Sequence, residues 1–72
     1  MTLQNQITIQ VNGERKEIAS GLMVTALLEQ MGLNQGRVAV ERNRAILSRN
    51  KWADTVIGEG DQFEIVQFVG GG

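Results

Sequence analysis

Alternating apolar and polar residues open the chain, with the two-residue period of a strand that has one buried face. Between residues 7 and 11 every second residue is Ile or Val, and the residues between them are polar. Asn12-Gly13 follows at once and supplies two residues that tolerate positive φ, as a type I′ turn requires. The charged segment 14–18 then returns, so the pattern predicts a β-hairpin.

The period changes to that of an amphipathic helix further along the chain. Apolar residues fall at spacings i, i+3, i+4 and i+7, and these residues are Val24, Leu27, Leu28 and Met31. Gly32 follows, and it suits the left-handed residue that ends many helices. Met23, just before the first apolar position, has no side-chain oxygen to accept a main-chain N–H. The pattern predicts a helix and sets its first residue only to within a few positions.

Short elements make up the second half of the chain. Residues 38–43 and 45–47 predict two strands joined at Asn43-Arg44. Because an arginine at positive φ is costlier than a glycine, we expect this turn to differ from the turn of the first hairpin.

A helical turn, a loop and a last strand follow. Residues 48–55 predict a short helical turn, capped by Ser48 and attached to the core by Trp52. The glycine-marked segment 58–61 predicts a turn. Residues 62–69 predict the last strand, in which apolar side chains occupy both faces toward the end.

The order of these elements is strand, strand, helix, strand, strand, short helix, strand, which indicates an α+β domain. The helix is expected to cover one face of the sheet, since each must bury an apolar face. A crossover of this length allows the first and last strands to pair in parallel. We therefore predict a ubiquitin-like β-grasp fold, with a mixed sheet of four to five strands and one main helix packed on one face. The domain is expected to span residues 1–69, followed by a flexible glycine tail at 70–72.

Composition restricts the chemistry of this chain. Its 72 residues include no Cys and no His. A thiolate nucleophile, a general base of near-neutral pKa and zinc sites built on Cys or His are therefore all excluded. We expect no catalytic residue and no metal site, and a protein that partner enzymes act upon.

Charge and hydropathy narrow the class of partner. The net charge is −1, and the basic residues of the second half are not interleaved with aromatic side chains, so neither nucleic acid nor membrane is expected to bind. We expect these basic residues, Arg42, Arg44, Arg49 and Lys51, to form solvated surface, and Asp61 to be an ordinary turn residue. The first ten residues do not have the composition of a signal peptide, and no apolar run approaches the roughly 20 residues of a membrane span. The expected location is cytoplasmic.

The glycine tail carries the chemistry that remains. At pH 7 the α-carboxylate of Gly72 is ionised, and such a carboxylate can attack the α-phosphate of ATP to give an acyl-adenylate. Without a Cβ, the backbone at Gly70 and Gly71 can pass through a narrow channel. Of Phe68 and Val69, a strand can direct only one toward the core. The other is expected to lie exposed beside the tail, where it could dock onto an activating enzyme.

Several segments resemble the ThiS family of sulfur carriers of thiamine biosynthesis. They are "VNGE" at 11–14, "VTALLEQMGL" at 24–33, "VAVE" at 38–41, Trp52, and "GDQFEIVQFVGGG" at 60–72. The last of these is the most specific, because a Gly-Asp turn leads directly into the terminal strand and glycines.

The resemblance implies both a reaction and partners. Gly72 would be adenylated by an E1-like, ThiF-type enzyme that holds ATP and Mg²⁺, while the chain itself binds no cofactor. The adenylate would become a thiocarboxylate with sulfur from a donor protein, and thiazole synthase, a ThiG-type enzyme, would receive the sulfur. Gly71 would complete the terminal pair and Gly70 would extend the arm.

Two alternatives stay open at this point. The small subunit of molybdopterin synthase, a MoaD-like carrier, shares the β-grasp fold, the terminal Gly-Gly and the same activation chemistry. A ubiquitin-like module that only binds or is conjugated would use its sheet surface or an isopeptide bond, with no sulfur transfer.

Overall fold

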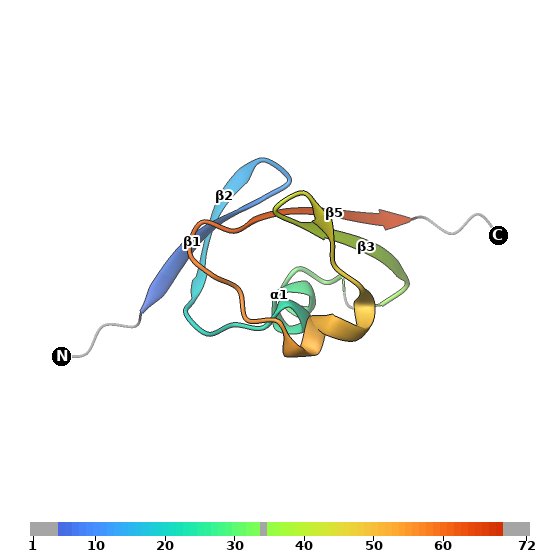
Figure 1. Cartoon of the computed structure of the whole chain (residues 1–72), viewed down its shortest axis with the longest axis horizontal. Helices are drawn as coiled ribbons and strands as arrows, with labels where there is room; N and C mark the ends of the chain where they lie inside the picture. The colour runs from blue at the N-terminus through green and yellow to red at the C-terminus, as the bar shows by residue number, and fades with distance from the viewer. Residues whose placement is uncertain (1–4, 34, 69–72) are drawn as a thin grey trace.

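The computed structural model describes residues 5–33 and 35–68, and these form one mixed sheet with two helical segments beneath it (Figure 1). The strands are β1 Gln6–Val11, β2 Glu14–Ala19, β3 Arg37–Arg42, β4 Ala45–Ile46 and β5 Gln62–Phe68. The α-helix α1 spans Val24–Gln30, and the 3₁₀-helix η1 spans Arg49–Asp54. The element order predicted from the sequence is confirmed.

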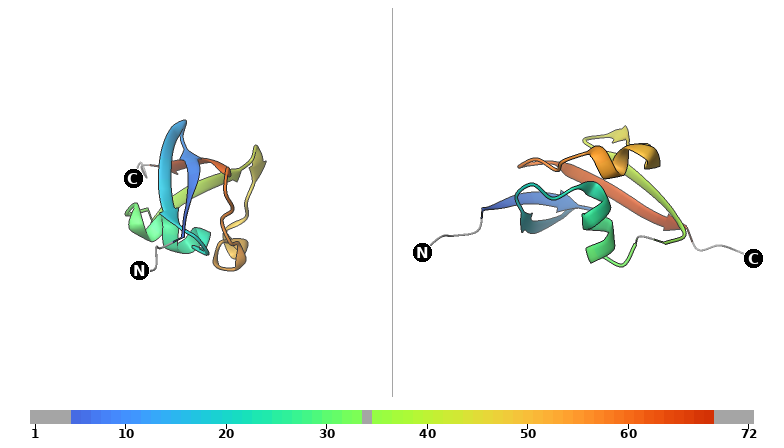
Figure 2. Two further views of the ribbon diagram at one scale, coloured as in Figure 1. Left: turned by 90° about the vertical axis from the view of Figure 1, so that its left-hand side faces the viewer. Right: turned by 90° about the horizontal axis from the view of Figure 1, so that it is seen from below.

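The five strands lie in the order β2-β1-β5-β3-β4, so the last strand occupies the centre of the sheet. β1 and β5 run parallel, and the other three neighbouring pairs run antiparallel. Both helical segments lie on the same side of the sheet, which Figures 1 and 2 show from three directions. This arrangement confirms the predicted β-grasp fold.

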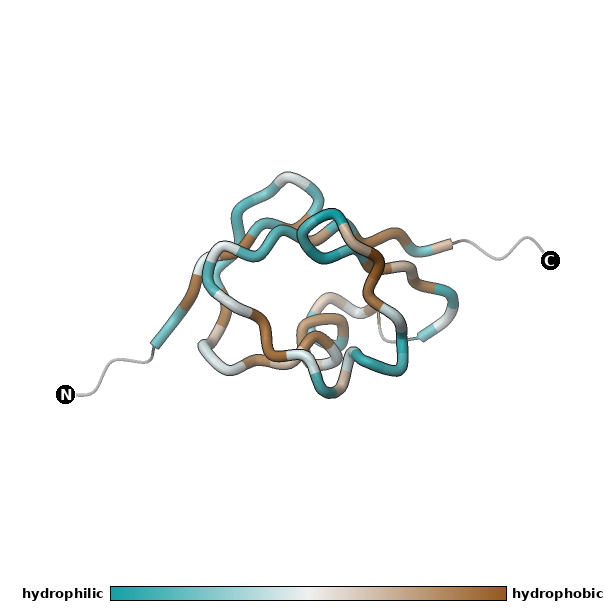
Figure 3. Tube along the Cα trace, in the orientation of Figure 1, coloured by the Kyte–Doolittle hydropathy of each residue, from teal (hydrophilic) through white to brown (hydrophobic). Residues whose placement is uncertain are grey.

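The inner face of the sheet and α1 form one hydrophobic core. Alternate strand residues point into it, and the apolar stripe of the helix meets them, as the two periods require. The most buried large side chains are Ile9, Val24, Leu27, Leu28, Val40 and Phe63. Figure 3 shows hydrophobic segments in the helix and in the central strands. Among the described residues, no helix is long and apolar enough to cross a membrane.

Both hairpin turns place their two central residues at positive φ. Asn12 and Gly13 have φ of 52° and 83°, which confirms the first turn. Asn43 and Arg44 have φ of 52° and 72°, so the prediction that the second turn differs from the first is wrong. The side chain of Asn43 explains the outcome. Its Oδ1 accepts the Gln62 N–H at 2.9 Å, and this hydrogen bond stabilises the turn despite the arginine.

A neighbouring segment takes the place of a side-chain cap at the start of α1. Met23 makes no capping hydrogen bond through its side chain. Instead, the main-chain N–H of Val24 donates to the carbonyl of Thr55 at 3.0 Å. At the other end Gly32 has φ of 74°, which confirms the predicted left-handed end of the helix.

Trp52 attaches η1 to the rest of the molecule, as predicted. Its side chain is buried, and its Nε1–H donates to the carbonyl of Leu47 at 3.0 Å. The predicted cap is wrong, because the side chain of Ser48 makes no capping bond. The main-chain carbonyl of Ser48 accepts the Lys51 N–H at 2.9 Å, and this hydrogen bond closes the first turn of η1.

Candidate functional site

The predicted site lies at the C-terminal end of β5. Gly70, Gly71 and Gly72 lie outside the described residues, as does Val69 of the predicted docking pair. Phe68 is the last residue of β5 and the last described residue of the chain. The site is therefore built here from the strand that leads to the tail and from the surface around it.

Core packing and sheet pairing hold the first half of β5. Phe63 and Ile65 point inward and are 1% and 6% exposed. On one side the strand pairs with β3 along its length, up to Arg37 opposite Phe68. On the other side the ladder with β1 is short and ends where Val11 lies opposite Phe63.

The side chain of Asn12 extends this short ladder. Its Oδ1 accepts the Ile65 N–H at 2.8 Å, and its Nδ2–H donates to the Ile65 carbonyl at 3.1 Å. The main-chain N–H of Asn12 also donates to the Phe63 carbonyl at 2.8 Å. An amide side chain thus occupies the place that a further strand residue would fill.

A buried carboxylate ties the start of β5 to the turn between β3 and β4. Asp61 is 7% exposed. Its Oδ2 accepts the Gly58 N–H at 2.8 Å and lies 2.9 Å from both Nε and Nη2 of Arg42. Its Oδ1 accepts a hydrogen bond from Asn43 Nδ2 at 3.1 Å. The donors come from the loop before β5, from the turn between β3 and β4, and from the end of β3. Asp61 therefore joins these three segments in addition to forming a turn.

These contacts set the protonation state of Asp61. Burial alone would raise the pKa of its carboxyl group, but the hydrogen bonds from Gly58, Asn43 and Arg42, with the charge of Arg42, outweigh burial. The pKa therefore lies below its ordinary value, and the group is a carboxylate at neutral pH. Both oxygens of this group accept hydrogen bonds, and the arrangement positions the start of β5.

The expectation that the basic residues form plain solvated surface is wrong for Arg42. Its side chain is 33% exposed and forms the ion pair with Asp61. Arg49 is exposed but engaged, because its guanidinium lies 4.9 Å from the centre of the Trp52 ring and its Nη2 donates to the Gly36 carbonyl at 2.8 Å. Both arginines serve the fold.

Exposed apolar side chains gather on the outer face of the sheet, opposite the core. Phe68 is 55% exposed, Val66 is 51% exposed and Ile46 is 81% exposed. Ala39 lies opposite Val66 in the sheet and completes this outer patch of four residues, Ala39, Ile46, Val66 and Phe68. The predicted docking residue Phe68 is thus accessible, while its role in docking stays a prediction.

Sequence reasoning missed three members of the outer patch, Ala39, Ile46 and Val66. Val66 precedes Phe68 by two residues, so the strand period alone places both on one face. Ile46 lies in a strand of only two residues, where no alternation can be read. The alternation of side chains along the last strand was therefore the signal in the sequence that could have identified Val66.

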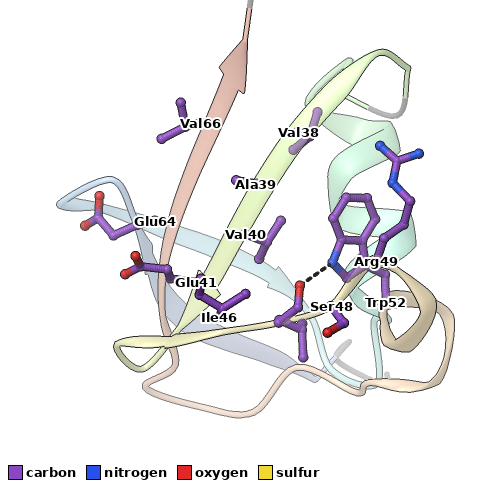
Figure 4. Close-up of a pocket in the computed structure, with 11 residues that line it drawn as sticks. Val38, Ala39, Val40, Glu41, Ile46, Ser48, Arg49, Trp52, Glu64 and Val66 are labelled. Carbon is purple, nitrogen blue, oxygen red and sulfur yellow. Dashed lines mark hydrogen bonds between the residues drawn. The ribbon is translucent and has the colours of Figure 1, made fainter.

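Two carboxylates flank the outer patch. Glu41 and Glu64 lie directly opposite each other in the antiparallel pair of β3 and β5, and Figure 4 shows their side chains close together below Val66. Like charges in this position destabilise a sheet. Their placement therefore gives the outer face a negative charge beside its apolar side chains without helping the fold.

A cavity of about 300 Å³ adjoins the outer patch along the edge of β3. Ala39, Ile46 and Val66 contribute to its wall on one side, and Trp52 and Arg49 of η1 on the other, as Figure 4 shows. The outer surface of β3, β4 and β5 is thus hollowed and mainly apolar.

A mixed sheet with a parallel central pair, one covering helix and a C-terminal central strand defines a ubiquitin-like β-grasp protein. The chain belongs to the ThiS family, whose model matches residues 9–72. A ThiS thiamine biosynthesis protein from Geobacter metallireducens, known from its crystal structure, superposes with a TM-score of 0.77 at 35% identity. The superposition covers 92% of this chain and all of that one (100%).

The relatives in sequence include a sulfur carrier protein and a thiazole synthase. The sulfur carrier protein ThiS of Escherichia coli is 34% identical over 61 residues, which are 85% of this chain and 92% of that protein. The thiazole synthase of Paramagnetospirillum magneticum is 40% identical over 62 residues, which are 86% of this chain. The chain spans only 19% of the length of that thiazole synthase.

Proposed function

We propose that this protein is a sulfur carrier of thiamine biosynthesis and that Gly72 bears the sulfur. Membership of the ThiS family carries this proposal. The Escherichia coli and Geobacter metallireducens relatives have names from thiamine biosynthesis, which supports the thiazole branch over the small subunit of molybdopterin synthase. The similarity to a thiazole synthase supports an enzyme of that class as the sulfur acceptor.

The activation chemistry belongs to a partner. A carboxylate oxygen of Gly72 attacks the α-phosphorus of ATP in an E1-like enzyme that also holds Mg²⁺, and pyrophosphate leaves. A sulfur nucleophile, hydrosulfide in the simplest case, then adds to the acyl carbon of the adenylate. AMP leaves and a thiocarboxylate remains. This chain contributes the carboxylate and the surface by which the enzyme recognises it.

The outer patch supplies that recognition surface in this proposal. Two of its residues, Val66 and Phe68, lie on the strand that leads to the tail. Its apolar side chains are exposed to solvent, and this exposure does not stabilise the fold. Glu41 and Glu64 add negative charge beside it, which favours a partner surface with basic residues around an apolar centre. A domain docked on this face would have the tail within reach.

An intact-mass measurement tests the proposal. The protein is incubated with ATP, Mg²⁺, sulfide and the cognate E1-like enzyme. The expected mass rises by the difference between a sulfur and an oxygen atom, and fragmentation places this change on Gly72. The absence of such a product with the cognate enzyme would overturn the proposal.

A pair of shortened chains provides the control. Removing Gly71 and Gly72 is expected to abolish activation and to leave the melting temperature nearly unchanged, since the hydrophobic core of the described residues ends at Ile65. Removing Thr2 and Leu3 shortens the other end by as many residues and is expected to leave activation intact. A large loss of stability in the first variant would show that the glycines belong to the fold.

A further inference from the structure

We propose that the free edge of β5 at Gln67 receives an extended segment of the activating enzyme's main chain, which adds to the sheet as a further strand. This inference rests on the proposed function and specifies how the partner grips the strand before the tail. The proposed contact uses main-chain groups of β5, whereas the outer patch consists of side chains of β3, β4 and β5.

The direction of the main-chain groups in β5 follows from the bonds at its start. Gln62 exchanges hydrogen bonds with Asn43, on the β3 side. Phe63 and Ile65 bond to Asn12, on the β1 side. Because successive residues of a strand direct their N–H and carbonyl to opposite sides, those of Gln67 point to the β1 side.

The β1 side is open at Gln67. The ladder with β1 ends at Val11 opposite Phe63, and the Asn12 side chain extends it only to Ile65. In Figures 1 and 2, β5 continues past the tip of the hairpin formed by β1 and β2. Within residues 5–33 and 35–68, no main-chain group bonds to the N–H or carbonyl of Gln67. The strand thus offers a donor and an acceptor, spaced for another strand.

The two outermost strands carry protections that this stretch of β5 lacks. β2, an outermost strand, has a run of four charged residues at 14–17. β4, the opposite outermost strand, is two residues long. Charge and short length are common means of preventing strand addition. The free stretch of β5 consists of Val66, Gln67 and Phe68, without charge and without proline.

An extended main chain is the occupant whose chemistry matches this edge. Its N–H and carbonyl groups pair with those of Gln67, while the side chains of Val66 and Phe68 supply apolar contacts on the outer face, which is the usual mode of strand addition. The hairpin turn at Asn12-Gly13 borders the open edge and limits the added strand to the stretch beyond Ile65. The pairing would hold the chain extended as it enters the partner's active site.

Amide exchange of the wild-type protein tests this inference first. We expect the Gln67 amide to exchange rapidly in the free protein and at least about tenfold more slowly when the cognate E1-like enzyme is bound without ATP. The amide of Val66, directed toward β3, serves as the internal reference and is expected to stay protected in both states. Unchanged exchange at Gln67 in the bound protein would overturn the inference.

Two substitutions at the same position supply the second test. Gln67→Pro removes the outward N–H and leaves the ladder with β3 intact, whereas Gln67→Ala removes only the side chain beyond Cβ. We expect thiocarboxylate formation to fall about tenfold or more in kcat/KM for Gln67→Pro, with little change for Gln67→Ala and similar melting temperatures for both.

The outcomes separate the two proposals. Wild-type protein that acquires sulfur while Gln67→Pro reacts equally fast would overturn strand addition alone. Wild-type protein that acquires no sulfur would overturn the proposed function and this inference with it.

Discussion

The side-chain amide of Asn12 pairs with the main chain of Ile65 as a strand residue would, with its Oδ1 2.8 Å from the Ile65 nitrogen and its Nδ2 3.1 Å from the Ile65 oxygen. One residue therefore forms the turn of the first hairpin and continues the pairing of β1 with β5. Because β5 leads to the tail, this contact helps to fix the direction in which the tail departs.

Replacing Asn12 by Asp tests the value of this pairing. Asp tolerates positive φ nearly as well, but it places an oxygen against the Ile65 carbonyl in place of the donor. We expect a loss of about 1–3 kcal/mol in the free energy of unfolding, measured by denaturant titration. Asn12→Gly, which keeps the turn and removes both bonds, is the comparison variant. Wild-type stability in both would show that the amide contributes nothing.

The ion pair of Asp61 with Arg42 predicts a second stability effect. Asp61→Asn removes the charge and presents an amide to donors that all need an acceptor, so we expect a loss of about 2–3 kcal/mol. Glu59→Gln, which also removes one negative charge in the same loop from an exposed residue, is the matched control and is expected to change stability by less than about 1 kcal/mol. Equal effects in the two variants would contradict a special role for Asp61.

The lowered pKa of Asp61 predicts how stability depends on pH. Its carboxylate form is favoured in the folded protein, so its contribution is complete above the unfolded pKa, close to 3.8, and is lost as pH falls through the lower folded pKa. We expect wild-type stability to fall on acidification below about pH 4 more steeply than that of Asp61→Asn. Parallel pH profiles of the two proteins, measured by thermal unfolding, would contradict the assignment.

Arg44 predicts a stabilising substitution. Its φ of 72° lies in the left-handed region, where a side chain beyond glycine costs about 1 kcal/mol. Arg44→Gly is therefore expected to raise the free energy of unfolding by about 0.5–1 kcal/mol, and Arg44→Ala is expected to bring no such gain. If the free energy of unfolding rose equally in the alanine and glycine variants, the cause would be the loss of the arginine charge and not the backbone conformation.

The outer patch predicts a loss of docking without a loss of stability. Ile46 and Val66 are exposed, so the double variant Ile46→Ala/Val66→Ala is expected to keep the wild-type melting temperature within a few degrees. We expect kcat/KM for activation to fall about tenfold, as for the loss of an interface hot spot. Gln10→Ala changes an exposed residue elsewhere on the same outer face and serves as the control. Equal activation of the three proteins would rule out this face as the docking surface.

Local periodicity and turn chemistry were sufficient to predict the strands, the helix and the first turn. The stripe of Val24, Leu27 and Leu28 and the Asn12-Gly13 turn depend on residues close in sequence, and the structure confirms both. Parallel pairing of β1 with β5 was also predicted, because a crossover of this length allows it, and the structure confirms it.

Contacts between distant residues account for what the sequence did not reveal. Asp61 and Arg42 are 19 residues apart, and the bonds of Asn12 reach Ile65 across 53 positions. Neither pairing has a local signature. The second turn was wrongly expected to differ because the cost of Arg44 was visible locally, whereas the bonds of Asn43 to Gln62 and Asp61 were not.

The central place of β5 also governs when the domain can fold during synthesis. β1 and β2 leave the ribosome early and can form their hairpin, but β3 and β4 join them only through β5. The sheet cannot close until residues up to Phe68 have emerged from the exit tunnel, because its two halves meet only at β5. A nascent chain interrupted before β5 would keep its apolar segments exposed to chaperones and proteases. The outer patch therefore forms only on chains that have been synthesised as far as the end of β5.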